Sequence, residues 1–62
     1  MTAKDRNGKT IKVGSKAKWY DPEEEYRDLD RIWNVNEVSE EIIYLSDDFS
    51  ELEAYPSELE IV

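Results

Sequence analysis

The chain has 62 residues and contains neither cysteine nor histidine. This combination limits what it can fold into, because domains of this size commonly depend on disulfides or a zinc site for stability. A chain of this length buries only about 60% of the surface that it exposes when unfolded. We therefore expect one domain over residues 1–62 that is held together by apolar packing, and we allow for a flexible N-terminus over residues 1–10.

Charge is distributed unevenly along the sequence. Residues 1–20 contain six lysines and arginines and one aspartate, whereas the remainder contains two arginines and fifteen carboxylates. The net charge of −8 repels a phosphate backbone, which argues against general nucleic-acid binding. Alternatively, pairing of a basic strand beside an acidic one turns much of this asymmetry into cross-strand complementarity.

The sequence has no feature typical of a membrane protein. No apolar run approaches the roughly 20 residues of a membrane span, and the polar start "MTAKDRNGK" lacks the apolar stretch of a secretory signal. The missing cysteines fit a reducing compartment. We expect a soluble cytoplasmic protein without membrane contact.

Alternation of polar and apolar side chains predicts the strands. The segment 16–19, "KAKW", alternates lysine with apolar residues, so Trp19 is expected to point inward and Tyr20 outward. Turn signals at Asn7-Gly8 and Gly14-Ser15 precede it. Branched and aromatic residues favour a meander of three further strands, which short connections make antiparallel. These strands are expected over residues 31–38, 41–46 and 50–55, with turns at residues 39–40 and 47–49.

Three local features shape this meander and its ends. Val35 and Val38 differ in parity, which predicts a bulge near Asn36 or Glu37 if both point inward. The acidic run 21–30, "DPEEEYRDLD", is expected to hold one helical turn capped by Asp21, with Tyr26 and Leu29 lying back on the domain. Pro56 ends a strand, residues 57–59 fit a 3₁₀ turn, and residues 60–62 form the last strand.

Five short strands without a long helix are best accommodated by a strongly bent sheet that closes on itself. The fold class predicted is therefore all-β, a small five-stranded antiparallel barrel with a 3₁₀ turn before the last strand. Leu52 and Ala54 are expected inside it, and Tyr55 outside.

The words "AKWYD" and "YPSEL", in this order of elements, resemble SH3-like barrels over about residues 13–62, and in particular short uncharacterised SH3-like proteins of bacteria. In eukaryotic SH3 domains comparable segments line a groove for proline-rich peptides. The resemblance implies that Trp19 or Tyr20, Trp33 and Pro56 line such a groove. It also implies that acids of the long loop supply charge to it, namely Glu23, Glu24, Glu25 and Asp28.

Catalytic and metal chemistry has little support in the sequence. The thiols and imidazoles of ordinary hydrolases are missing, so we expect no enzyme and no cofactor. The acids of "SDDFSELE", Asp47, Asp48, Glu51 and Glu53, are interpreted as the polar tip of a hairpin. Together with Asp28 and Asp30 they lack the spacing of a calcium loop, so no metal site is expected.

Seven aromatic rings are more than so small a core can enclose, so some must reach the surface, either to cover strand edges or to meet a partner. We expect a non-enzymatic module that binds a protein or a basic peptide. The residues expected to take part are Tyr20, Glu24, Tyr26, Trp33, Tyr55 and Pro56. Two alternatives are a nucleic-acid-associated barrel with a lysine stripe (Lys9, Lys12, Lys16 and Lys18), or an acidic mimic of DNA that occupies a basic protein.

Overall fold

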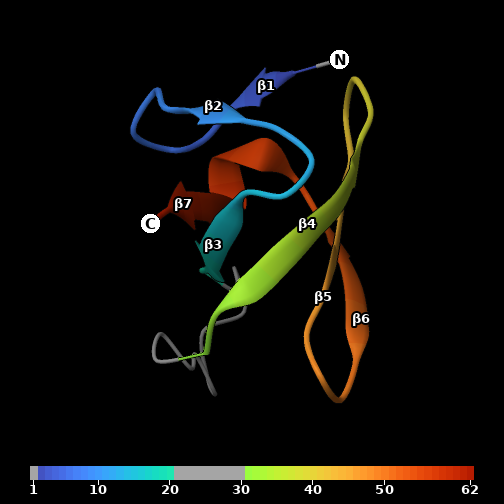
Figure 1. Ribbon diagram of the computed structural model, residues 1–62. Coiled ribbons are helices and arrows are strands. Elements are labelled where there is room, and N and C mark those ends of the chain that lie inside the picture. The colour runs from blue at the N-terminus through green and yellow to red at the C-terminus, as the bar shows by residue number, and fades with distance from the viewer. Residues whose placement is uncertain (1, 21–30) are drawn as a thin grey trace.

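The computed structural model describes residues 2–20 and 31–62, in which all regular structure is β-strand apart from one 3₁₀ turn (Figure 1). Two short strands, β1 (Ala3–Lys4) and β2 (Thr10–Ile11), pair as a separate antiparallel ribbon. Five further strands form the main sheet, and the 3₁₀ turn η1 (Pro56–Glu58) precedes the last of them. These strands are β3 (Lys16–Trp19), β4 (Trp33–Val38), β5 (Ile43–Ser46), β6 (Glu51–Ala54) and β7 (Leu59–Ile61).

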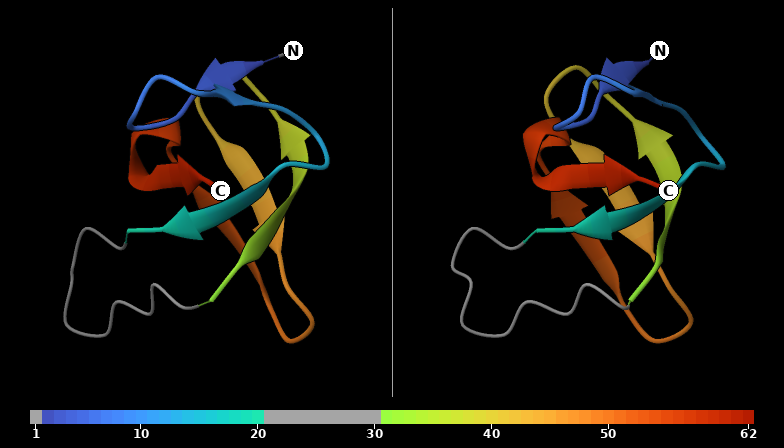
Figure 2. Two further views of the ribbon diagram at one scale, coloured as in Figure 1. Left: turned by 60° about the vertical axis from the view of Figure 1, so that its left-hand side comes forward. Right: turned by 90° about the vertical axis from the view of Figure 1, so that its left-hand side faces the viewer.

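The main sheet has the order β6-β5-β4-β3-β7, and every pair of neighbours is antiparallel. The all-β class and the five-stranded antiparallel sheet are thus as predicted. The sheet is strongly bent, so β3 and β7 are steeply inclined to β5 and β6 (Figure 2). Within the described residues no helix is long and apolar enough to cross a membrane.

The predicted strands agree closely with those observed. β3 has the predicted bounds, whereas β5 begins two residues later than expected because the backbone N–H of Ser39 donates to the carbonyl of Ile42 and closes the turn first. β1 and β2 are additional to the prediction, since strands of two residues are too short to show an alternation. The expected helical turn at Asp21 and the packing of Tyr26 and Leu29 lie outside the described residues.

The predicted bulge is confirmed in β4. The register between β4 and β5 shifts between Val35, which faces Leu45, and Glu37, which faces Tyr44. Because Asn36 is the extra residue, Val35 is buried and Val38 also packs against the core. The bulge therefore keeps the apolar side chains of β4 on one face.

Apolar side chains from six of the strands form one core. Trp19 is half-buried and packs edge-on against Trp33, with 6.4 Å between ring centroids, and Leu52 packs against the same cluster. The burial of Ala54 and the packing of Leu52 confirm that both point inward, as predicted. The buried members of the core are Ile11, Ala17, Trp33, Val35, Ile43, Leu45, Ala54 and Leu59.

The 3₁₀ turn occupies residues 56–58, one residue before the predicted segment, and it returns Leu59 to the core with no exposed surface. The Glu58 N–H donates to the carbonyl of Tyr55 at 2.9 Å. The Glu58 carboxylate accepts a hydrogen bond from the Trp19 indole at 3.1 Å. Glu58 therefore closes the turn through its backbone and attaches the turn to β3 through its side chain.

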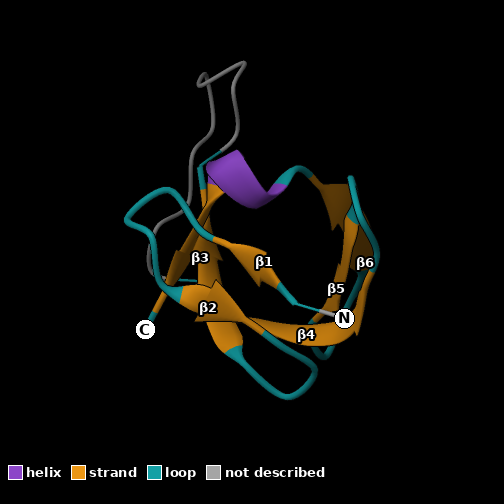
Figure 3. Cartoon of the chain, turned by 90° about the horizontal axis from the view of Figure 1, so that it is seen from above, coloured by secondary structure: helices purple, strands orange, loops and turns teal. Residues whose placement is uncertain are grey.

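Asp5 fastens the β1–β2 ribbon, which lies across one end of the bent sheet, to β7 (Figure 3). Its carboxylate is buried and accepts hydrogen bonds from the backbone N–H groups of Asn7, Lys9 and Ile61 at 2.7–2.8 Å. Burial raises the pKa of the Asp5 carboxyl, but the three N–H donors and the charge of Lys9 outweigh it and lower the pKa below the ordinary value. Residues 2–10 are thereby part of the folded unit.

Candidate partner-binding groove

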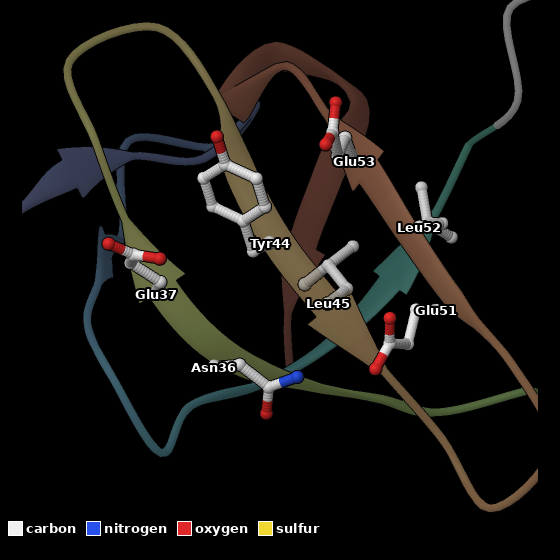
Figure 4. A pocket seen from close by; sticks show the side chains of 7 residues that line it. All are labelled: Asn36, Glu37, Tyr44, Leu45, Glu51, Leu52 and Glu53. Carbon is white, nitrogen blue, oxygen red and sulfur yellow. The ribbon is translucent and has the colours of Figure 1, made fainter.

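A shallow groove of about 550 Å³ lies on β4, β5 and β6 (Figure 4). Three of the residues that line it are glutamates, and the pleat of the sheet turns them away from the core. We call it the acidic groove. Its lining residues are Asn36, Glu37, Tyr44, Leu45, Glu51, Leu52 and Glu53.

The strand register places Tyr44 between two glutamates of the groove. Tyr44 of β5 is the cross-strand partner of Glu37 on one side and of Glu53 on the other. Directly opposed side chains on one face lie about 4.5–5.5 Å apart at Cβ, so both carboxylates flank the ring. The residue remains 36% exposed, which leaves the ring accessible from solvent.

The bulge contributes Asn36 to the lining of the groove. Asn36, the bulged residue, donates a hydrogen bond from its side-chain amide to the hydroxyl of Ser46 at 2.7 Å. Ser46 is in turn the cross-strand partner of Glu51. The carboxylate of Glu51 therefore lies on the same face as the Tyr44 ring, two residue pairs further along the β5–β6 ladder.

The groove carboxylates have no positive partner within residues 2–20 and 31–62. The side chains of Glu37, Glu51 and Glu53 make no hydrogen bond or ion pair there, whereas those of Glu58 and Glu60 both accept hydrogen bonds from side-chain donors. Three uncompensated carboxylates around one concave surface concentrate negative potential in it. The groove is thus complementary to a cation.

Arg31 lies close to the sheet, but its side chain binds residues of the β5–β6 turn. The Arg31 guanidinium pairs with Asp47 and donates to the Ser50 hydroxyl, and it also stacks 4.3 Å from the centre of the Trp33 ring. The ion pair with Arg31 holds the pKa of Asp47 well below its ordinary value, assisted by backbone N–H donors from Phe49 and Ser50. These contacts hold the turn in place, and Arg31 does not neutralise the glutamates of the acidic groove.

The residues predicted to bind a partner lie elsewhere. Tyr20 donates its backbone N–H to the carbonyl of Glu58 and therefore lies beside η1, where Tyr55 is exposed and Pro56 half-buried. Trp33 is only 4% exposed and belongs to the core, so its ring contributes to packing and not to a surface. Two further candidates, Glu24 and Tyr26, lie outside the described residues, as do the loop acids Glu23, Glu25 and Asp28.

Tyr20 is held by structural contacts. Its hydroxyl donates to the carboxylate of Glu60 at 2.9 Å, and the Arg6 guanidinium lies 3.9 Å above its ring. The same glutamate accepts a hydrogen bond from the Asn7 side chain. The described contacts of Tyr20 thus connect β3 to the N-terminal segment and β7.

The lysines proposed as a nucleic-acid stripe do not form a free row. The Lys16 ammonium donates to the Asn34 side chain at 2.9 Å, and Lys18 lies directly opposite Glu60 in the β3–β7 ladder. Lys9 and Lys12 are exposed in the segments flanking β2. Within the described residues, no three or more aspartates and glutamates are arranged so that they could hold a metal ion.

Sequence reasoning missed the acidic groove as a site. Glu51 and Glu53 were correctly placed on a strand, which is β6, but their carboxylates were interpreted as outward-facing acids of a polar hairpin tip and not as the lining of a groove. The usable signal was the pairing of "WNVNEV", "IYLS" and "ELEA", which places Tyr44 between two glutamates once the bulge is included. In comparisons with protein-family models, curated proteins and solved structures, the chain matches none.

Proposed function

We propose that the chain is a non-catalytic binding module, a small SH3-like barrel, whose acidic groove accepts a lysine- or arginine-containing segment of a partner protein. The observation that carries this proposal is the exposed ring of Tyr44 between the carboxylates of Glu37 and Glu53, none of them engaged by a cation in the described parts of the chain. The five-stranded bent sheet and the 3₁₀ turn before β7 support the barrel.

A cationic side chain gains two kinds of contact in such a groove. An exposed ion pair contributes about 0.2–1 kcal/mol. Contact of an ammonium or guanidinium with an exposed aromatic ring contributes about 0.5–1 kcal/mol. Three ion pairs and one ring contact therefore sum to roughly 1–4 kcal/mol, which corresponds to dissociation constants of about millimolar or weaker. Useful affinity requires contacts beyond these side chains.

A basic protein segment fits the groove better than nucleic acid does. A phosphate backbone would meet the glutamates, whereas Lys16 and Lys18 on β3 already face Asn34 and Glu60. The mimicry of DNA is a special case of the same proposal, because its target is also a basic protein. Catalysis is not part of the proposal, since acid–base work by carboxylates needs a partly desolvated site and these glutamates are exposed.

The test is titration of the protein with a fluorescent capped peptide of about seven residues that alternates lysine with threonine or valine. We expect saturable binding at about 50 mM salt that weakens as salt rises. A peptide with glutamine in place of lysine should not bind. Single- and double-stranded oligonucleotides form a separate arm, and their binding in place of the lysine peptide would overturn the proposal.

Two double variants locate the binding surface. Glu37→Gln with Glu53→Gln removes two charges from the groove and should weaken binding about three- to tenfold. Glu40→Gln with Asp48→Asn removes the same charge from exposed turn residues that do not line the groove. Equal losses in the two variants would mean that net charge, and not the groove, attracts the peptide.

A further inference from the structure

We infer that the partner segment binds in extended form and adds an antiparallel strand to the free edge of β6. This inference rests on the proposed function and names the binding mode that supplies the missing affinity. An edge strand offers unpaired N–H and C=O groups that a peptide can use as a template. The two outer strands of the main sheet differ in this respect.

The edge of β7 is already covered. The Arg6 backbone N–H donates to the carbonyl of Leu59 at 3.0 Å, and the Ile61 N–H donates to the Asp5 carboxylate at 2.7 Å. The Leu59 carbonyl and the Ile61 N–H, which point away from β3, are therefore satisfied by the N-terminal segment. β7 has no room for another strand without displacement of this segment.

The edge of β6 is free within the described residues, and β6 lies at the margin of the sheet (Figure 1). The Asp47 N–H donates to the carbonyl of Ser50, so these two residues form a hydrogen-bonded pair of the β5–β6 ladder. Hydrogen-bonded and non-hydrogen-bonded pairs alternate along an antiparallel ladder. The N–H and C=O groups of Glu51 and Glu53 therefore point away from β5, toward the free edge.

The side chains of β6 determine which residues an added strand should contain. Glu51 and Glu53 project on the groove face, so an added strand would place its residues opposite them on that same face, where lysine or arginine gives opposite-charge pairs. The alternate residues of the added strand would lie beside Leu52, which is half-buried, and favour small apolar side chains. A second copy of β6 would set glutamate against glutamate, so self-pairing is disfavoured.

The test uses two N-methylated versions of the lysine peptide. Methylation of the lysine nitrogens removes the donors that face Glu51 and Glu53, whereas methylation of the intervening residues modifies the nitrogens that point away from β6. The two peptides have the same charge and the same number of methyl groups. We expect the first to lose about tenfold or more in affinity and the second to stay close to the parent peptide, because each lost backbone hydrogen bond weakens binding several-fold.

The outcomes separate this inference from the proposed function. If the unmethylated peptide does not bind, the proposed function fails. If it binds and all three peptides bind equally, the groove is a binding site but strand addition is wrong. Hydrogen exchange gives a readout without a variant: the amides of Glu51 and Glu53 should gain protection when the peptide binds, whereas those of Leu52 and Ala54 should already be protected in the free protein. Unchanged exchange at Glu51 and Glu53 would overturn the inference.

Discussion

The carboxylate of Asp5 accepts a hydrogen bond from the backbone N–H of Ile61 at 2.7 Å, which connects positions 56 residues apart. Asp5→Ala removes this acceptor and also those of the Asn7 and Lys9 N–H groups. A buried donor left without a partner costs about 1–3 kcal/mol, so we expect about 3 kcal/mol or more in the free energy of unfolding. Urea denaturation measures it. Asp48→Asn, an exposed change of the same charge, should stay within about 0.5 kcal/mol.

The same carboxylate makes stability depend on pH. Because its pKa in the folded state is lower than the ordinary value of 3.8, the unfolded chain takes up the proton first as the pH falls. The contribution of Asp5 is therefore complete above about pH 5 and is lost progressively as the pH falls from the ordinary value toward the folded-state pKa. Denaturation midpoints between pH 6 and about pH 2.5 should fall less steeply for Asp5→Asn than for the parent. Parallel curves would contradict the buried ionised carboxylate.

The burial of two leucines in the β4–β6 meander predicts which of them costs more stability when it is replaced by alanine. Leu45 is 1% exposed and its cross-strand neighbour Leu52 is only partly buried. Leu45→Ala should cost about 2–5 kcal/mol, and Leu52→Ala should cost less, because part of its side chain already meets solvent. Thermal melts of the two variants give the comparison. A larger loss for Leu52→Ala would place that side chain deeper in the core than the structure does.

Arg31 is expected to be intolerant of lysine. Its guanidinium pairs with Asp47, reaches Ser50 and stacks on Trp33, and an ammonium cannot make all three contacts. Arg31→Lys keeps the charge but should loosen the β5–β6 turn. Faster hydrogen exchange of the Ser50 amide, which donates to Asp47, would report this. Unchanged exchange would show that charge alone holds the turn.

The sequence predicted those parts of the fold that depend on neighbours along the chain. "KAKW" alone predicts β3, because its lysines alternate with apolar residues and successive side chains of a strand point to opposite faces. The parity of Val35 and Val38 was sufficient for the bulge. Trp33 has the same parity as Val35, so its burial could also have been predicted, but its assignment to a ligand groove followed the resemblance to SH3 domains.

Contacts between residues far apart in the sequence could not be predicted from the alternation of side chains within single strands. Asp5 sits in a polar stretch that is typical of a surface loop, and only the approach of Ile61 makes its carboxylate a buried acceptor. The acidic groove depends on register across three strands, and a slip of one residue would turn Tyr44 to the opposite face. Register is set jointly by turn geometry and the bulge, so alternation within one strand does not reveal it.

Gly14 tests the backbone of the turn before β3. Its φ of +93° lies in the left-handed region, and a Cβ added there would meet no heavy atom within 4 Å. Gly14→Ala should therefore cost about 1–2 kcal/mol from backbone strain alone. D-alanine, introduced by chemical synthesis, favours positive φ and should instead stabilise the protein by about 0.4–1 kcal/mol, since it restricts the unfolded chain. Thermal unfolding of the two chains measures the difference. Equal destabilisation by both enantiomers would mean that the side chain meets an obstacle, and that the positive φ is not the reason for glycine at this position.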